Sequence, residues 1–423
     1  MKYSFLDQDQ YKFTMQQGAI QRFPNLKVRY KFINRGKTIW PEGLAQKLRE
    51  RLKQFSEEAI LTKEELEYLT GIRFFLPFFL WVLSKYRFDV SEVHVSDNID
   101  DTTVEGYWWR TILWECIFLS MLSELYHEMS GHKLPERFIL TKLNMSKGWE
   151  FYKNDIHIVE GGFRRRFSFE NQDYVIGDFV KSAQSCFVGT SNVYFAKKYN
   201  LIPIGTVAHE WYMVHSALYG YHEANRMALE NWIKVYNGDL GTALPDTFTT
   251  KAFLNIFDTR FSKLFDGLRQ DSGDPFTWGH MVLDHYYKTI RDKYIIQSKS
   301  GIFSNALDNM KDILSINDTF KNELVTRFMI GTWLTCDVPI IDSRDGYSKV
   351  VNPEQAGFQF VGTKDNFDLS SIERVKPLNI VMKLSHVLVN GMWVPVVKLG
   401  DGSGEKYTGD PEQIELAKKI LHI

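Results

Sequence analysis

One stretch, Gly205–His215, joins a turn to a histidine in an order that suits chemistry. The apolar run Leu201–Ile204 comes before it and predicts the end of a buried strand. Gly205 and Thr206 then form a turn whose backbone N–H groups can bind anions, and His209 falls where a helix should begin. A capped structural histidine fits this pattern as well. An imidazole at the carboxyl end of a strand, however, is positioned for catalysis.

A second stretch, residues 268–275, places several reactive groups in one turn. It carries the cation of Arg269, the carboxylates of Asp271 and Asp274, and the flexible Gly273 between them. A barrel glycosidase that uses the two aspartates as its acid and base is one interpretation. Carboxylates three residues apart on one turn lack the separation of roughly 5 Å or more across a glycosidic bond that this chemistry needs. The spacing therefore argues against glycoside hydrolysis.

Three further segments predict a phosphate pocket: Arg164–Arg166, Gly189–Ser191 and Gly331–Thr332. The planar guanidinium group of arginine can donate paired hydrogen bonds to phosphate oxygens, and glycine lets backbone N–H groups approach an anion. The alternative interpretation is that the three arginines lie on the surface and are simply exposed to solvent. With His209 and the carboxylates, the set fits phosphoribosyl transfer, in which an oxocarbenium-like ribose forms as pyrophosphate leaves. Carboxylates would stabilise that ribose, while Mg²⁺ and arginines hold the pyrophosphate.

Residue spacing argues against other common sites. His209 and His215 are six residues apart, so they do not share a helix face as the two histidines of a zinc-binding HExxH motif do. The sequence has no P-loop and no complete GxGxxG motif. The glycine-rich stretch 400–406 has the wrong lysine spacing for a P-loop and predicts a flexible loop.

Composition limits the class of protein. The 423 residues suffice for two domains, and the net charge of -1 argues against a nucleic-acid scaffold or a polybasic membrane binder. Three widely spaced cysteines predict no disulfide framework and a reducing compartment. The apolar run Phe74–Leu83 is shorter than the about 20 residues that span a bilayer, and it predicts a buried core element broken by Pro77. We expect a cytoplasmic protein without a signal peptide.

The middle of the chain predicts an α/β barrel. Short apolar runs alternate with helical stretches, and each run ends in a polar or glycine-rich turn. The runs are Ile156–Val159, Phe187–Val188, Ile202–Ile204, Ala243–Leu244, Ile302–Phe303 and Phe328–Ile330. Polar residues at the carboxyl ends of parallel strands form the active face of such a barrel. His209, Asp246 and Ser304 each follow a run in this way.

The two chain ends predict a second domain. The N-terminal region is mainly helical, whereas the tail predicts strands over Leu378–Leu384 and Trp393–Leu399, a hairpin turn at Asn390–Gly391 and a helix after Asp410. The expected class is α/β, an irregular TIM-like α/β barrel plus a smaller α+β sandwich domain formed by both chain ends. The expected boundaries are 1–135 with 376–423 for the sandwich, 136–340 for the barrel and 341–375 for an insertion.

These motifs together resemble the nicotinate phosphoribosyltransferase family in its bacterial and fungal form. The resemblance follows the family's order over nearly the whole chain and rests on the segments 6–12, 163–168, 189–192, 205–211, 269–275 and 376–384. Enzymes of this family join nicotinate to phosphoribosyl pyrophosphate, forming nicotinate mononucleotide and pyrophosphate in the salvage route to NAD, and couple this step to ATP hydrolysis. The resemblance implies a homodimer with shared active sites, with ATP and Mg²⁺ required and no nucleic-acid or membrane partner.

The resemblance also implies roles for individual residues. His209 falls on the histidine that the family phosphorylates from ATP, and a phosphoimidazole adds acceptor oxygens that can organise Mg²⁺. The metal would then be held through the substrate and not by protein ligands. Arg269 and Asp271 fall near the base and the ribose. The substrate-binding positions are Tyr11 (lent by a partner subunit), Arg164 (over the pyridine ring), Thr190, Ser191, Asp246 (in the ribose–pyrophosphate region), Ser304, Gly331 and Thr332 (both in the 5′-phosphate loop).

Ser191 bears on the choice of substrate. In nicotinamide-using relatives an aspartate at this position can accept from the amide, whereas Ser191 lacks the charge that would repel nicotinate. A nicotinamide phosphoribosyltransferase is therefore the less favoured alternative. A non-catalytic ligand-binding protein on the same fold is another, and the retained His209 argues against it.

The chain departs from the family pattern in two places. Asn305 stands where an aspartate usually follows Phe-Ser, which removes an acid from the ribose region. The region from Pro339 to Val375 is longer than the family's usual connection. Within it, Asp342–Gly346 and Val361–Gly362 predict a hairpin over the site or at an interface.

Overall fold

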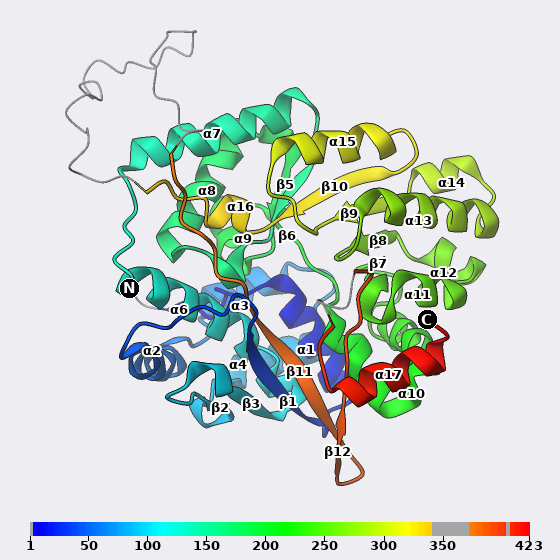
Figure 1. Cartoon of the computed structure of the whole chain (residues 1–423), viewed down its shortest axis with the longest axis horizontal. Coiled ribbons are helices and arrows are strands. Elements are labelled where there is room, and N and C mark those ends of the chain that lie inside the picture. The colour runs from blue at the N-terminus through cyan, green and yellow to red at the C-terminus, as the bar shows by residue number, and fades with distance from the viewer. Residues whose placement is uncertain (1–2, 341–371, 403–406) are drawn as a thin grey trace.

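The computed structural model describes residues 3–340, 372–402 and 407–423. Its strands form two sheets, one parallel and one antiparallel, with helices packed around them (Figure 1). No helix within these ranges is both long and apolar enough to cross a membrane. The hairpin predicted within the insertion lies outside the described residues.

The larger sheet has seven strands in the order β6-β5-β4-β10-β9-β8-β7, and every pairing is parallel. Because β6 and β7 are its two ends and do not pair, the sheet is a curled, open barrel, which confirms the predicted irregular α/β barrel. Its strands are β4 (Ile158–Glu160), β5 (Phe187–Thr190), β6 (Ile202–Pro203), β7 (Thr242–Ala243), β8 (Gly267–Gln270), β9 (Ser300–Phe303) and β10 (Val325–Ile330). The sequence did not predict β8, since Leu268 is its one apolar residue besides glycine.

Helices connect the parallel strands and cover the sheet. The structure has α7 (Arg137–Lys153), η3 (Phe163–Arg165), α8 (Phe169–Ser182), η4 (Gln184–Cys186), α9 (Val193–Tyr199), α10 (His209–Tyr236), η5 (Pro245–Phe248), α11 (Thr250–Ile256), α12 (Thr259–Leu264), α13 (Pro275–Thr289), α14 (Lys293–Gln297), α15 (Met310–Phe320) and α16 (Thr332–Thr335). Asp274 caps α13 by accepting a hydrogen bond from the backbone N–H of Thr277 at 2.7 Å. The second aspartate of the 268–275 turn therefore starts a helix.

The smaller sheet is antiparallel and combines both chain ends, as predicted. Its order is β12-β11-β1-β3-β2, so the N-terminal β1 pairs with the C-terminal β11, which lie side by side in Figure 1. The strands are β1 (Lys27–Asn34), β2 (Val93–His94), β3 (Thr103–Tyr107), β11 (Ile380–Val389) and β12 (Met392–Pro395). The helices of this part are α1 (Gln10–Arg22), α2 (Leu44–Glu58), α3 (Lys63–Thr70), α4 (Pro77–Lys85), η1 (Val90–Glu92), η2 (Ile99–Asp101), α5 (Trp108–Thr111), α6 (Trp114–Met129) and α17 (Pro411–Leu421).

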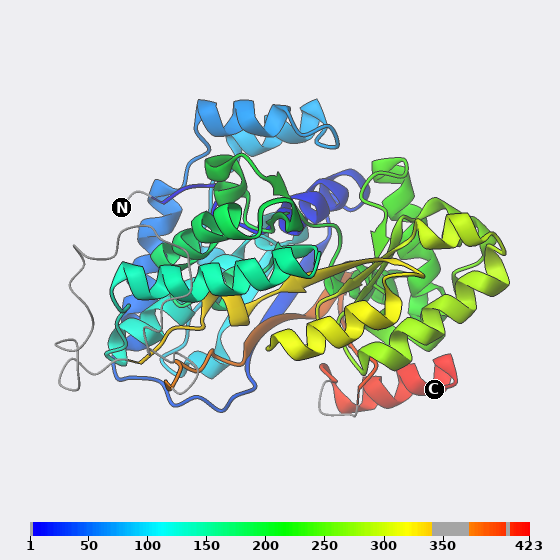
Figure 2. The ribbon, with the colours of Figure 1, turned by 90° about the horizontal axis from the view of Figure 1, so that it is seen from above.

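The apolar run Phe74–Leu83 is only partly buried, so the prediction of a buried core element broken by Pro77 is wrong. Pro77 is the first residue of α4, where its missing N–H costs no helix bond. The helix buries one face and leaves Phe78 and Trp81 59% and 61% exposed. Figure 2 shows α3 and α4, in lighter blue, at one edge of the molecule, where only one side of a helix can meet the core.

The C-terminal hairpin forms at the predicted turn. Asn390 and Gly391 have φ values of 49° and 82°, as a two-residue hairpin turn requires. Strand β11 extends beyond the predicted Leu384 to Val389, because it pairs with β1 along its length and with β12 at its end. The predicted helix after Asp410 is α17, and Asp410 caps it.

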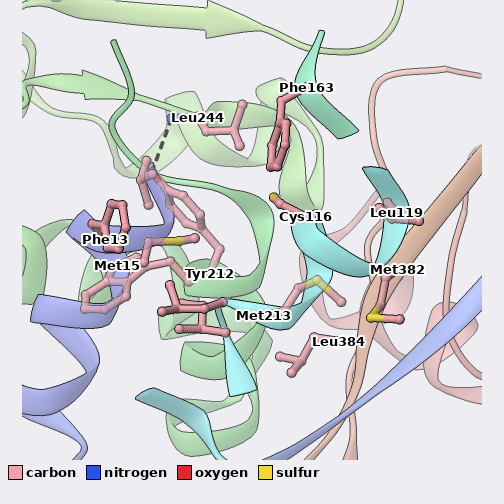
Figure 3. Packing of buried hydrophobic residues seen from close by; sticks show 14 of the residues in the cluster. Phe13, Met15, Cys116, Leu119, Phe163, Tyr212, Met213, Leu244, Met382 and Leu384 are labelled. Atoms are coloured by element: carbon pink, nitrogen blue, oxygen red, sulfur yellow. Dashed lines mark hydrogen bonds between the residues drawn. The ribbon is translucent and has the colours of Figure 1, made fainter. Parts of the chain in front are cut away.

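The two sheets share an apolar core. Figure 3 shows side chains that meet there from distant parts of the chain: Phe13 and Met15 from α1, Cys116 and Leu119 from α6, Tyr212 and Met213 from α10, and Met382 and Leu384 from β11. The backbone N–H of Leu244 donates to the Tyr212 hydroxyl, which joins the end of β7 to α10. This core fixes the carboxyl ends of the parallel strands against β11.

Candidate active site

A pocket of about 280 Å³ lies between the carboxyl ends of the parallel strands and strand β11. It is lined by residues that follow β5, β6, β8, β9 and β10, together with residues from α1, α6 and β11. Eight positions predicted from the sequence meet here, namely Tyr11, Arg164, Ser191, His209, Arg269, Asp271, Ser304 and Gly331. The structure thus gathers most of the predicted site in one place.

His209 is the first residue of α10 and is 5% exposed. Its Nε2 lies 2.9 Å from Asp271 Oδ2, and its Nδ1 lies 3.0 Å from the Thr247 hydroxyl. An ionised carboxylate only accepts hydrogen bonds, so Nε2 carries the proton and Nδ1 has the lone pair. The Thr247 hydroxyl donates to that lone pair. The ring is therefore held in one tautomer, with its nucleophilic nitrogen defined.

Burial keeps His209 neutral near pH 7. Burial and the nearby Lys398 ammonium lower its pKa to about 4, although Asp246 and Asp271 act in the opposite direction. Burial alone would raise the pKa of Asp271, but Arg269 and the hydrogen bond from His209 hold it well below its usual value. A neutral imidazole paired with an ionised carboxylate is the arrangement that a nucleophilic histidine needs.

The loops after β8 and β9 are tied together around Asp271. Arg269 Nη2 lies 3.4 Å from Asp271 Oδ1, and the Ser304 hydroxyl lies 3.0 Å from the same oxygen. Asn305 donates from Nδ2 to the carbonyl of Gly273 at 3.1 Å. The asparagine that departs from the family pattern therefore fastens one loop to the other.

The stretch 400–402 also holds this turn. The carboxylate of Asp401 accepts a hydrogen bond from the backbone N–H of Thr250 at 2.6 Å. The backbone N–H of Asp401 donates to the Ser272 hydroxyl at 2.8 Å. Gly400 has a φ of 82° and packs against Ser272, so residues 400–402 form a loop, as predicted, that is held against the 268–275 turn. Residues 403–406 lie outside the described residues.

Three predicted substrate-binding residues, Thr190, Asp246 and Thr332, are not among those that line the pocket. Thr190 is fully buried and donates its hydroxyl hydrogen to Glu160 at 2.5 Å. Asp246 is fully buried as well, accepts from the Ser272 hydroxyl at 2.5 Å and pairs with Lys398 at 3.3 Å. Thr332 begins α16 directly after Gly331, which does line the pocket. Local sequence placed these residues at strand ends but did not show which way they face.

The three arginines of segment 164–166 do not all face the pocket. Arg164 and Arg165 line the pocket. Arg166 is buried instead and pairs with Asp7 at 2.8 Å and Glu124 at 2.7 Å. Only the first two arginines therefore face the pocket as the predicted phosphate site requires.

Tyr11 lines the pocket of its own chain, and its hydroxyl lies 3.3 Å from Cys116 Sγ. Its presence in the site therefore does not depend on a partner subunit, and the homodimer stays a prediction. Ser191 donates its hydroxyl hydrogen to Asp9 at 2.6 Å. The serine thus offers the pocket only lone pairs, so discrimination between acid and amide cannot rest on Ser191 alone.

Six charged pocket residues were not predicted as site residues: Asp9, Arg35, Glu115, Glu210, Lys383 and Lys398. Asp9, Glu210 and Lys383 stand within segments that carry the family resemblance, whereas Arg35, Glu115 and Lys398 stand outside them. One usable signal was a lysine within the apolar strand Ile380–Val389, since charges are rarely buried without a purpose. Burial lowers the pKa of Lys383 to about 8.

One group of side chains could hold a divalent cation. Ligand atoms of His209, Asp246 and Asp271 lie within 4.8 Å of one another. Asp246 Oδ1 is buried and has no hydrogen-bond partner among the described residues. Hard oxygen ligands of this kind fit Mg²⁺, although the Lys398 ammonium next to Asp246 opposes a cation bound without anionic substrate. These carboxylates therefore suit a metal that arrives with phosphate groups.

An open α/β barrel with such a pocket at its strand ends defines a barrel-type phosphoribosyltransferase. The model of the nicotinate phosphoribosyltransferase family matches residues 156–352, and the model of that family's N-terminal domain matches residues 6–123. The chain belongs to the nicotinate phosphoribosyltransferase family.

Individual relatives agree with the family match. The chain is 36% identical to the nicotinate phosphoribosyltransferase of Chromohalobacter salexigens, covering 99% of this chain and 98% of that one, and 38% identical to the one of Desulforapulum autotrophicum over the same shares. Among solved structures, the Porphyromonas gingivalis enzyme has a TM-score of 0.87 at 34% identity and full coverage of both chains. A Saccharomyces cerevisiae structure described as a putative nicotinate phosphoribosyltransferase has a TM-score of 0.84 at 30% identity, covering 100% and 98%.

Proposed function

We propose that this protein transfers the phosphoribosyl group of phosphoribosyl pyrophosphate to nicotinate, forming nicotinate mononucleotide and pyrophosphate for NAD biosynthesis, and couples the transfer to ATP hydrolysis through a phosphohistidine at His209. The observation that carries the proposal is the neutral imidazole held in the pocket between Asp271 and Thr247. A pocket that only bound ligands would have no need of this arrangement.

The first step follows from the tautomer of His209. The Nδ1 lone pair attacks the γ-phosphorus of ATP, the bond from that phosphorus to the bridging oxygen breaks, and ADP leaves. Asp271 stabilises the positive charge that develops on the imidazole, because it accepts the hydrogen bond from Nε2. The Thr247 hydroxyl must turn away from Nδ1 and can then donate to a phosphoryl oxygen. Water later hydrolyses the phosphohistidine to free phosphate.

The second step breaks the bond between ribose C1 and pyrophosphate, while the pyridine nitrogen of nicotinate attacks C1. Asp271 provides negative charge for the oxocarbenium-like ribose, and Arg269 and Lys398 provide positive charge for the departing pyrophosphate. Mg²⁺, when bound, neutralises phosphate oxygens, and Asp246 and Asp271 would hold it together with the substrate.

The charge of the pocket favours the acid over the amide. Six cationic side chains line it (Arg35, Arg164, Arg165, Arg269, Lys383 and Lys398), against four carboxylates (Asp9, Glu115, Glu210 and Asp271). The surplus of positive charge attracts the nicotinate carboxylate and the phosphates alike. Selection against nicotinamide would therefore come from the cations, with Ser191 contributing only the absence of another acid.

The direct test supplies nicotinate or nicotinamide with phosphoribosyl pyrophosphate, with and without ATP, and measures the mononucleotide formed. We expect nicotinate mononucleotide, with more product when ATP is present, and little product from nicotinamide. A second assay incubates the protein with γ-labelled ATP alone and looks for an acid-labile phosphoryl group on His209. Equal use of both bases, or an unlabelled His209 in an active enzyme, would contradict the respective part of the proposal.

A further inference from the structure

A buried lysine that was not predicted as a site residue connects two walls of the pocket. Lys12 lies on α1 and is fully buried. Its ammonium group donates to Glu115 Oε2 at 2.5 Å and lies 3.2 Å from Glu210 Oε2. Glu115 comes from α6 and Glu210 from α10, so one cation joins three helices.

Both carboxylate partners of Lys12 face the pocket, whereas Lys12 does not line it. Glu115 uses its other oxygen to approach Arg164 Nη1 at 3.5 Å. Glu210 directly follows His209 in the first turn of α10. The lysine is thus linked through Glu115 to the arginine at the expected base position, and through Glu210 to the helix turn that carries the histidine.

The group pairs two cations, Lys12 and Arg164, with the carboxyl groups of Glu115 and Glu210. Burial raises the pKa of Glu210 and the Lys12 ammonium lowers it, so the negative charge of Glu210 depends on the lysine. A buried ion-pair network that served only stability is replaceable by apolar residues of similar size, often without loss. Removing the lysine alone leaves two carboxylates facing a pocket that must accept an anionic base and several phosphates.

We propose that Lys12 is a positioning residue, which fixes Arg164 through Glu115 and the first turn of α10 through Glu210, so that nicotinate binding and phosphorylation of His209 both depend on one buried ammonium group. The inference rests on the proposed function. The inference goes beyond the proposed function because it assigns roles to Lys12, Glu115 and Glu210, which the reaction itself does not require.

The test separates the two connections by neutral, near-isosteric substitutions. Glu115→Gln weakens the connection from Lys12 to Arg164 and keeps Lys12 paired with Glu210, so we expect the dissociation constant of nicotinate, measured by calorimetry without turnover, to rise roughly tenfold or more. The rate of His209 labelling by ATP alone should change less than about twofold. Glu210→Gln should do the reverse, slowing labelling by roughly tenfold and leaving nicotinate affinity within about twofold of wild type.

Lys12→Met removes both connections and should impair nicotinate binding and labelling together, whereas Lys12→Arg keeps the charge and should recover part of each. The matched control is Lys299→Met, since Lys299 is also a buried lysine, donates to the carbonyl of Phe265 at 2.6 Å and precedes β9 at the amino end of the parallel sheet. This control should lower the free energy of unfolding without changing either readout.

The inference is overturned if folded Lys12→Met binds nicotinate and is labelled like wild type. It is also overturned if Glu115→Gln and Glu210→Gln change both readouts equally. Should Lys12→Met fail to fold, the two glutamine variants decide the matter by themselves. Failure of the wild-type protein to bind nicotinate or accept phosphate from ATP would instead refute the proposed function, and the inference with it.

Discussion

His209 and His215 lie in the first two turns of the same helix, α10, and differ in what surrounds them. His209 meets Asp271, Thr247 and the pocket. His215 is fully buried, donates from Nδ1 to the carbonyl of Trp211 at 2.6 Å and accepts from Asn231 at 3.0 Å. Burial lowers the pKa of both rings to about 4.

The comparison shows that a low pKa alone does not identify a catalytic histidine. His215 packs among aromatic rings, with Trp211 at 4.9 Å and Phe23 at 5.3 Å between ring centroids, and both of its nitrogens are occupied by fixed partners. His209 has one nitrogen fixed by a carboxylate, while its other nitrogen accepts from a hydroxyl that can rotate. What distinguishes the two histidines is a charged partner and access to the pocket.

The strongest test of the difference between His209 and His215 is to remove each imidazole ring in turn. His209→Asn should lose labelling by ATP completely, because no other group occupies its place. Folded His215→Ala should be labelled at the wild-type rate. Phosphate incorporated from γ-labelled ATP measures both, and labelling of His209→Asn at the wild-type level would show that the phosphoryl acceptor lies elsewhere.

Arg269 tests whether the charges around the first histidine matter for turnover. Arg269→Ala removes the cation that holds Asp271 ionised and that faces the pyrophosphate, so kcat should fall by roughly 10² or more. Steady-state rates with nicotinate measure the effect. Arg260→Ala is the control, since Arg260 pairs with Glu230 at the surface. Near-normal turnover of Arg269→Ala would contradict its role.

The second histidine should matter for stability. His215→Ala leaves Asn231 without its partner and opens a cavity among the rings, so the free energy of unfolding should fall by roughly 2 to 4 kcal/mol. Urea denaturation followed by fluorescence measures this loss. A variant as stable as wild type would mean that the surroundings of His215 repack around the smaller side chain.

The two histidines should share one weaker effect, a pH dependence of stability. Their folded pKa values of about 4 lie below the ordinary value of 6.5, so between these limits the unfolded chain binds protons that the folded chain does not. The free energy of unfolding therefore falls as the pH drops from 6.5 to 4, by up to about 1.4 kcal/mol per pH unit for each ring. Urea midpoints at pH 7 and pH 5 measure it.

His215→Ala is the control for this pH dependence. It should lose less stability than wild type over the same interval, because one of the two rings no longer contributes. An equal loss in the two proteins would show that the pKa of His215 is not lowered by its surroundings.

Local patterns predicted much of the barrel and its reactive groups. Short apolar runs that end in polar turns marked most of the parallel strands, and the carboxyl ends of such strands meet at one edge for geometric reasons. His209, Asp246 and Ser304 were placed at strand ends in this way, whereas Arg269 and Asp271 were assigned to the site through the family resemblance. Strand β8 was missed, because Arg269 and Gln270 interrupt its apolar character where it reaches the pocket.

The remainder of the pocket could not be predicted, because it depends on long-range pairing. Lys12, Glu115 and Glu210 meet only when α1, α6 and α10 pack together, and no local pattern reports that contact. Likewise, Lys383 enters the pocket only through the pairing of β11 with β1. Thr190 is the last residue of β5, yet its side chain faces Glu160 and not the pocket.

The sequence by itself determined which groups can react and which strand ends present them, since residue type and the alternation of apolar and polar segments are local properties. It also determined the family, through motifs spread over the chain. Only the tertiary structure decided which histidine of α10 meets a carboxylate, which arginine faces the pocket and which lysine joins its walls. Those outcomes depend on burial and on contacts between residues far apart in the chain, which arise only when the two sheets pack against each other.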